Sequence, residues 1–365
     1  MSTNIVKIDS AIAERLQAFI ISDLFTIRSD VAKSEYWKHF GDKLHTSISG
    51  NSVEIAGESG FYVPEPSSAL TRATRKVLRA TKQPSIAGNW LKRQVAALLG
   101  VEGLMSYEMA FDAIMSHAED SDPIISSYKV NHRKLEQHPK VFSSTAAVKR
   151  HYQDWSGYHA SDSIINHYYY QNILRGFIGE DQLRTVLEIG AGNGNFPSIL
   201  YHDWAPLRVI LIDLPETLAV AIPFLSGLFS HAKLVMPNEI QVNGFPAEFD
   251  FAFLTVDQLE CIADNSVDLA INCDSFQEMT HRQIDIYFKL VQRAGRDGSF
   301  FFTRNRVEKI PCGADPFSVE QPDPPNRFAD YPWDPRNEVL VYEICRLNRL
   351  VQLDDASMRL ERIRK

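Results

Sequence analysis

The chain has 365 residues, a length that fits two domains of roughly 100 to 200 residues each better than one small module. Apolar residues make up 44% of it and charged residues 23%, which excludes an intrinsically disordered chain and a fibrous repeat. Because the 46 Asp and Glu outnumber the 38 Lys and Arg, the net charge is −8, and we expect no nucleic-acid partner.

The first 150 residues carry mostly helical patterns. Apolar Ile12, Leu16 and Ile20 recur every four residues, which predicts an amphipathic helix over 11–28. Charged residues interrupt this stretch, so we expect neither a secretory signal nor a membrane-spanning helix. After a turn-rich break at 57–66, further helices are predicted over 66–82, 85–99 and 103–118. We therefore expect a mainly helical N-terminal domain over 1–175.

Residues 151–170 are unusually rich in aromatic side chains and histidines. One interpretation is a seam between helices in which the rings are core. The other is the wall of an acceptor-binding pocket, supplied by the N-terminal domain. On that interpretation the first candidates for acceptor contacts are Tyr152, Trp155, Tyr158, His159 and Tyr168.

From residue 185 onward, short apolar runs alternate with helical stretches. The predicted strands are TVLEIGAG, RVILIDLP, FDFAFLTVD, VDLAINCDS and GSFFFTRNRV, and a long proline-rich loop over 311–335 precedes another strand at 338–345. Such alternation predicts an α/β domain over 176–365, a parallel sheet with crossover helices. A ligand of such a sheet binds at the carboxyl ends of the strands.

The first of these strands runs directly into the pattern E-x-G-x-G-x-G, from Glu188 through Gly190 and Gly192 to Gly194. Glycine has no Cβ, so the backbone can turn sharply and approach a ligand closely. A nicotinamide or flavin fingerprint, G-x-G-x-x-G, would need glycine where Asn195 stands, which weakens the dinucleotide interpretation. The second strand ends in Asp213, whose carboxylate can accept hydrogen bonds from both ribose hydroxyls of an adenosyl ligand.

The segments VLEIGAGNGNF and VILIDLP resemble motif I and the second-strand acid of class I S-adenosylmethionine-dependent methyltransferases, over roughly residues 180–310. This resemblance implies a Rossmann-like fold and S-adenosylmethionine as methyl donor, with S-adenosylhomocysteine as product. The donor would be bound by Glu188, Gly190, Gly192, Asn193, Gly194, Asp213 and Asp274, with an adenine contact at Asp257 and Gln258.

Within that class, NCDSFQEM at 272–279 and the pair Asn305-Arg306 resemble the bacterial sugar O-methyltransferase family. That resemblance implies O-methylation of a sugar or of a small secondary metabolite, with Arg306 among the acceptor contacts. Two further enzymatic alternatives are methylation at carbon or nitrogen of an aromatic acceptor and an NAD-dependent oxidoreductase. A methyltransferase-like protein that only binds ligand is a third alternative, since a fold does not fix a function.

Transfer from a sulfonium to an alcohol needs in-line alignment and removal of the alcohol proton, and neither step needs a metal. Glu278 and His281 follow the fourth predicted strand and are the first candidates for proton acceptor, with Asp274 close by. Thr280 and Gln283 have capping-box spacing, so His281 is expected at a helix N-terminus, which disfavours the imidazolium. The alternative is an exposed histidine without a catalytic role.

The four cysteines, Cys261, Cys273, Cys312 and Cys345, form no CxxC pair, so we expect reduced thiols and no metal centre. These features favour a cytoplasmic enzyme with a small-molecule acceptor. We expect no membrane partner, and a homodimer is an open alternative.

Overall fold

The computed structural model describes residues 2–26, 34, 37–38, 44–57, 167, 170–171, 173–179, 181–204, 207–240, 245–309, 324–344 and 356–365. The helices predicted over 66–82, 85–99 and 103–118 lie outside these residues, as does most of the aromatic segment. Of that segment only His167 and Tyr170 are described.

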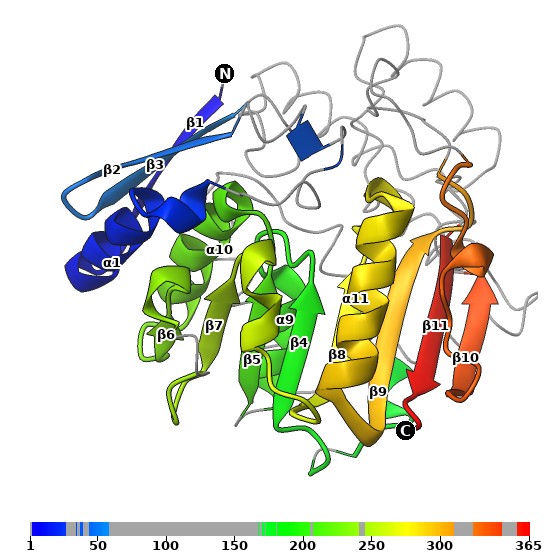
Figure 1. Ribbon diagram of the computed structural model, residues 1–365. Helices are drawn as coiled ribbons and strands as arrows, with labels where there is room; N and C mark the ends of the chain where they lie inside the picture. Colours follow the sequence, from blue (N-terminus) through cyan, green and yellow to red (C-terminus); the bar gives the residue numbers. More distant parts are fainter. Residues whose placement is uncertain are drawn as a thin grey trace, which may run out of the picture.

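One mixed sheet forms the centre of the fold, with its eight strands in the order β10-β11-β9-β8-β4-β5-β7-β6. The strands are β4 (Thr185–Ile189), β5 (Arg208–Ile212), β6 (Leu234–Val235), β7 (Phe251–Leu254), β8 (Val267–Cys273), β9 (Gly295–Arg306), β10 (Glu338–Ile344) and β11 (Ala356–Arg362). All neighbouring pairs from β6 to β9 are parallel, and only β11 runs against its two neighbours (Figure 1). This confirms the predicted α/β class and fits a Rossmann-like fold, so the carboxyl ends of β4, β5, β7, β8 and β9 share one edge.

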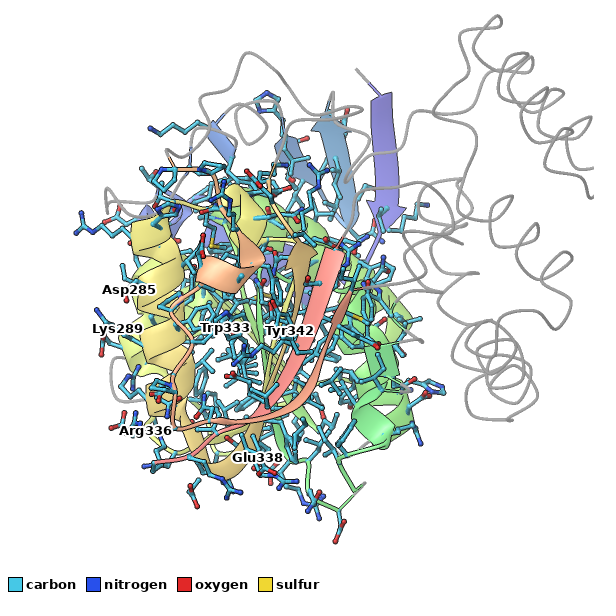
Figure 2. The ribbon with its side chains drawn as sticks, turned by 90° about the vertical axis from the view of Figure 1, so that its right-hand side faces the viewer. Asp285, Lys289, Trp333, Arg336, Glu338 and Tyr342 are labelled. Carbon is cyan, nitrogen blue, oxygen red and sulfur yellow. The ribbon has the colours of Figure 1, made fainter. Side chains whose placement is uncertain are left out.

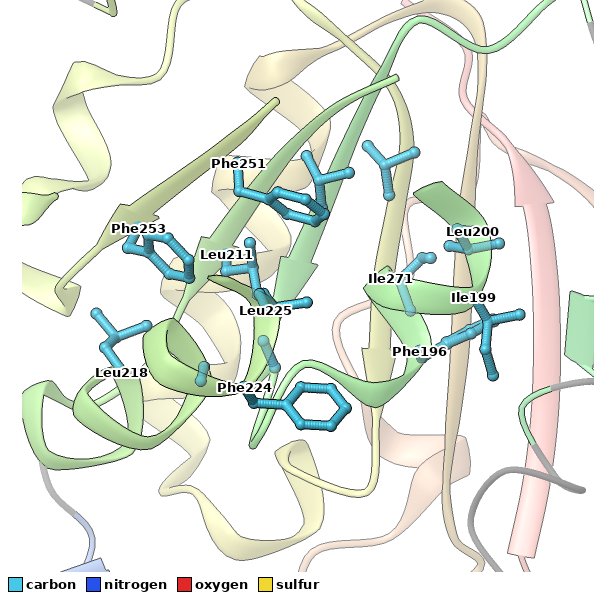
Figure 3. Packing of buried hydrophobic residues seen from close by; sticks show 14 of the residues in the cluster. Phe196, Ile199, Leu200, Leu211, Leu218, Phe224, Leu225, Phe251, Phe253 and Ile271 are labelled. Atoms are coloured by element: carbon cyan, nitrogen blue, oxygen red, sulfur yellow. The ribbon is translucent and has the colours of Figure 1, made fainter. Parts of the chain in front are cut away.

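Helices cover both faces of this sheet. α9 (Asn195–Trp204) and α10 (Pro215–Leu228) lie on one face, and α11 (His281–Ala294) lies on the other (Figure 1). Successive strand residues therefore join different cores. Phe251 and Phe253 of β7 belong to the core that includes α9 and α10, whereas Ala252 belongs to the core that includes α11. Figure 3 shows the first of these cores. Because the sheet is buried on both faces, the sequences of its strands are nearly continuous runs of apolar residues.

The β10 edge of the sheet carries an aromatic cluster. Trp333 and Tyr342 lie close together there (Figure 2), and the guanidinium of Arg359 from β11 lies 4.2 Å and 5.5 Å from their ring centroids. The single-turn 3₁₀ helix η6 (Phe328–Asp330) adds Phe328, whose ring stacks on Tyr342. These contacts hold the segment before β10 against the sheet.

The N-terminal segment differs from the helical expectation. β1 (Ser2–Lys7), β2 (His45–Ser49) and β3 (Ser52–Gly57) form a three-stranded antiparallel sheet in the order β1-β3-β2. The predicted helix over 11–28 is present but shorter, as α1 (Ser10–Ile20) followed by the 3₁₀ helix η1 (Asp23–Phe25). Gly50 at φ +59 and Asn51 form the two-residue loop between β2 and β3, a hairpin signal that the sequence interpretation missed. The expected mainly helical character is therefore not confirmed in the described part.

A bidentate ion pair connects this N-terminal unit to the β6 end of the central sheet. The guanidinium of Arg15 on α1 donates to both carboxylate oxygens of Glu239 at 2.6 Å, and the same carboxylate accepts from the Met236 N–H. Glu239 belongs to the 3₁₀ helix η3 (Pro237–Glu239), which follows the edge strand β6. Within the described ranges no helix has the length and apolar character needed to cross a bilayer.

Candidate functional site

The glycine loop follows β4 at the carboxyl edge of the sheet. Gly190, Gly192 and Gly194 have φ angles of +72°, +58° and +85°, a region that side chains strain. A Cβ at Gly190 would overlap the side chain of Ser275, and one at Gly194 would meet Leu225 at 3.0 Å. The alternating glycines thus let the loop turn sharply and lie against the segment after β8.

Asp213, at the end of β5, is hydrogen-bonded to this loop. Its Oδ2 accepts from the Gly192 N–H at 2.8 Å and its Oδ1 accepts from the Leu214 N–H at 2.7 Å. The side chain is 9% exposed, and burial raises the pKa of Asp213 to about 7 despite these two donors. A carboxylate that titrates near neutral pH therefore lies at the junction of β4 and β5.

Glu188 provides a second buried carboxyl group at the same junction. Strand alternation places it on the face of β4 that α9 and α10 cover, and it is 3% exposed. Its Oε2 atom has no hydrogen-bond partner among the described residues. Burial, and then the nearby carboxylate of Asp213, raise the pKa of Glu188 well above its ordinary value. The site therefore holds an acceptor oxygen that a cationic ligand group could satisfy.

The two residues predicted as adenine contacts lie on the 3₁₀ helix η4 (Val256–Cys261), which follows β7, and have different surroundings. Gln258 is buried, and its amide accepts from the Thr255 N–H at 3.1 Å and donates to the Pro237 carbonyl at 2.8 Å. Its polar atoms thus support η4 itself. Asp257 is exposed. Tyr287 of α11, which the sequence analysis did not single out, is buried near Asp213 and Asp257. Burial raises its pKa, and the two carboxylates raise it further.

The segment after β8 is locally strained. Asp274 has a φ of +65°, a left-handed conformation that only two non-glycine residues of the described chain adopt. Its N–H donates to the Arg304 carbonyl at 2.8 Å, and its half-exposed carboxylate is paired with the buried Arg304 guanidinium. Ser275, the next residue, packs against Gly190. Asp274 is therefore held next to a residue that packs against the glycine loop.

The motif residues at 272–279 and at 305–306 form one buried polar network. The Asn272 amide donates to the Ile189 carbonyl at 2.9 Å and its Oδ1 accepts from the Asn305 amide at 2.9 Å. The Gln277 N–H donates to Asn305 Oδ1 at 3.1 Å, and Gln277 Oε1 accepts from the Arg306 N–H at 2.7 Å. Two motifs separated in sequence thus fix the ends of β4, β8 and β9 relative to each other.

Asn326 also fixes this turn, although no sequence motif pointed to it. It is 2% exposed, and its amide donates to the carbonyls of Met279, Gln277 and Phe276 at 2.6, 3.2 and 3.4 Å. It comes from the proline-rich segment after β9. That segment therefore supports the turn that carries Glu278.

The two candidate proton acceptors have different environments. Glu278 is 8% exposed and lies near Tyr331, whose pKa is raised by burial and then by the Glu278 carboxyl. His281 is exposed at the first position of α11. The predicted capping box is confirmed, since the Thr280 N–H donates to Gln283 Oε1 at 2.7 Å and Thr280 Oγ1 accepts from the Gln283 N–H at 3.3 Å.

His167 is a further histidine on the α9 side of the sheet. Its ring stacks on Phe196 with centroids 5.1 Å apart and planes 8° apart, and burial and then Arg304 lower its pKa to about 3. The imidazole is therefore neutral at physiological pH. Tyr170 is 1% exposed and packs on Phe302, so for this residue of the aromatic segment the core interpretation is confirmed.

The remaining predicted residues are only partly described. Asn193 is 9% exposed in the glycine loop, and Arg306 is half-buried at the end of β9. The predicted acceptor contacts Tyr152, Trp155, Tyr158, His159 and Tyr168 lie outside the described residues. Among the residues that are described, no group of three or more His, Cys, Asp or Glu could hold a metal ion.

Comparison with known proteins found likenesses of fold only. No family model and no curated protein matches the chain. Solved structures that it resembles include a protein of Pyrococcus horikoshii, at 14% identity over 59% of this chain and 99% of that one, with a TM-score of 0.37. A SAM-dependent methyltransferase of Aquifex aeolicus matches at 16% identity over 53% and 88% of the two chains, with a TM-score of 0.32.

A phosphoethanolamine N-methyltransferase of Haemonchus contortus, solved with S-adenosylhomocysteine, matches at 14% identity over 53% of this chain and 52% of that one, with a TM-score of 0.35. With TM-scores below 0.5, these likenesses leave the function to be inferred from the geometry of the site.

Proposed function

We propose that the chain is an S-adenosylmethionine-dependent methyltransferase that methylates a hydroxyl of a sugar or of a small secondary metabolite. The observation that carries the proposal is the glycine loop, whose three glycines have positive φ. The Gly192 N–H of this loop donates a hydrogen bond to the carboxylate of Asp213 at the end of β5. Backbone without side chains, next to a buried carboxylate, suits the close approach of an adenosyl ligand.

The order of the strands gives the site a direction. β7, β5 and β4 are neighbours in that order, and their ends carry Asp257, Asp213 and the glycine loop. An adenosyl ligand has adenine, ribose and an amino-acid part in the same linear order. Asp257 would therefore lie at the adenine, Asp213 at the ribose hydroxyls, and Glu188 at the amino-acid part, where its unpartnered Oε2 could accept from an ammonium group.

The acceptor would lie beyond the glycine loop, toward β8 and β9. S-adenosylmethionine, when bound, supplies a methyl group on a sulfonium that is already a good leaving group. The chain must then orient the hydroxyl and accept its proton, roles that we assign to Glu278 and His281, with Arg306 as an acceptor contact. The network around Asn272 and Asn305 would hold this turn in place.

The proposal is tested with labelled S-adenosylmethionine and a panel of sugars and hydroxylated small molecules. The unmodified protein should transfer label to a hydroxyl of at least one compound. Asp213→Ala should weaken binding of S-adenosylmethionine and S-adenosylhomocysteine about 10- to 100-fold without unfolding the protein, because two hydrogen bonds to the ribose are lost. Asp257→Ala provides a comparison, because it removes the carboxylate assigned to the adenine and leaves the one assigned to the ribose. Unchanged affinity in Asp213→Ala would contradict the ribose assignment.

Donor affinity should depend on pH through Asp213. Since burial raises the pKa of this carboxyl to about 7, it is largely protonated below that value and accepts weakly from ribose hydroxyls. Affinity for S-adenosylhomocysteine should therefore rise about tenfold between pH 6 and pH 8, with release of a proton on binding below pH 7. Calorimetry in buffers of different ionisation enthalpy measures both effects. A flat affinity over this range would show that Asp213 is already ionised at pH 6.

A further inference from the structure

One more buried polar side chain directly follows the glycine loop. Asn195 begins α9 and is 5% exposed, and its Oδ1 atom has no hydrogen-bond partner within the described part of the chain. An Asn near the start of a helix ordinarily accepts from a backbone N–H of the first turn. Asn195 Oδ1 makes no such bond, so no described residue compensates its desolvation.

The start of α9 is secured without this side chain. The Ser198 N–H donates to the Gly194 carbonyl at 3.0 Å, and Ser198 Oγ donates to the main-chain oxygen of Asn195 at 2.7 Å. Phe196, which is 1% exposed, packs into the core of that face. The helix therefore gains its hydrogen bonds and its packing from other groups, and the amide of Asn195 needs another explanation.

Asn195 and Glu188 belong to the same layer of the molecule. Glu188 lies on the face of β4 that α9 covers, and its Oε2 is likewise buried without a partner in the described residues. Two unsatisfied acceptor oxygens thus belong to residues that adjoin the glycine loop in the chain, Glu188 before it and Asn195 after it. An ammonium group brings three N–H donors and a positive charge, which complements such a pair.

We infer that Asn195 Oδ1 accepts a hydrogen bond from the α-ammonium of the S-adenosyl ligand, beside Glu188. The inference rests on the proposed function, because it assumes that S-adenosyl compounds bind at this loop. It makes Asn195 a selectivity residue: the site discriminates ligands that keep the amino-acid part from adenosine derivatives that lack it.

The test compares two probes in the full-length protein by calorimetry. S-adenosylhomocysteine has the amino-acid part, and 5′-methylthioadenosine lacks it. Asn195→Ala should weaken S-adenosylhomocysteine about 10- to 100-fold, the size of a lost hydrogen bond to a charged group, while 5′-methylthioadenosine binds as before. The melting temperature without ligand should stay the same or rise, because a buried unsatisfied oxygen is removed.

Ser198→Ala is the matched control, a buried polar residue of the same helical turn whose hydroxyl has a partner. It should leave the ratio of the two affinities unchanged. Equal weakening of both probes in Asn195→Ala would show a purely structural role and overturn the inference. Decarboxylated S-adenosylmethionine keeps the ammonium group but lacks the carboxylate. If Asn195→Ala binds it as well as the unmodified protein does, the contact is to the ligand carboxylate, and the inference is overturned. If neither probe binds the unmodified protein, the proposed function itself fails.

Discussion

Replacing Gly190 with alanine should abolish binding of S-adenosylhomocysteine and lower the free energy of unfolding by about 2–4 kcal/mol. Gly190 has a φ of +72°, and the added Cβ would overlap the Ser275 side chain. Ser275 has little room to move, because its Oγ donates to the Ile189 carbonyl at 3.2 Å and accepts from the Asn272 amide. The loop itself must therefore shift, and with it the surface that the ligand would contact.

Gly298→Ala separates backbone strain from the effect on the site. Gly298 has a φ of +83°, but a Cβ there would meet nothing within 4 Å. This variant should lose only about 1–2 kcal/mol, the cost of a side chain in the left-handed region, and should bind ligand normally. Denaturant unfolding and calorimetry on the two variants measure both quantities. Normal binding by Gly190→Ala would show that the ligand does not depend on this loop.

Removal of the proton acceptor should lower the rate of methyl transfer by about 10² to 10⁴. Two variants test this. Glu278→Gln keeps the shape of the buried side chain but removes its charge, and His281→Ala removes the imidazole at the start of α11. Donor affinity should stay nearly unchanged in both, because neither residue lies at the strand ends assigned to the adenosyl group. Single-turnover rates with an acceptor found in the panel measure the chemical step.

Arg282→Ala is a suitable control, since Arg282 is an exposed neighbour on the same helical turn. It should transfer methyl groups at the normal rate. If Glu278→Gln and His281→Ala both keep nearly full single-turnover rates, the pair is not the proton acceptor, and Asp274 and His159 are the next candidates. A loss in one variant alone would identify the acceptor.

The central sheet could be predicted because its strands obey simple rules. Strands buried on both faces are continuous apolar runs, so β4, β5, β7 and β8 stood out from the helices between them. The glycine spacing then indicated where a ligand approaches, and Gly190, Gly192 and Gly194 do adopt positive φ. The hairpin β2-β3 was missed because its strands are short and half-exposed. β11 was missed although apolar Ala356, Met358 and Leu360 alternate with polar residues in it, a regular strand pattern that the sequence interpretation did not use.

The residues that the sequence could not reveal act across long distances in the chain. Asn326 donates to carbonyls 47 to 50 residues earlier, and Tyr287 approaches Asp213 and Asp257 only because α11 packs over the sheet. Asn195 follows the motif directly, but its unsatisfied oxygen is a property of burial, which spacing does not report. Local patterns thus predict the loop, whereas its supporting contacts depend on the packed fold.

A calorimetric titration of the unmodified protein with S-adenosylhomocysteine, and in parallel with NADH, tests the donor site most directly. The glycine loop, Asp213 and Glu188 together predict one S-adenosylhomocysteine bound per chain and no heat with NADH. Heat with NADH and none with S-adenosylhomocysteine would contradict the assignment and favour a dinucleotide-binding protein instead.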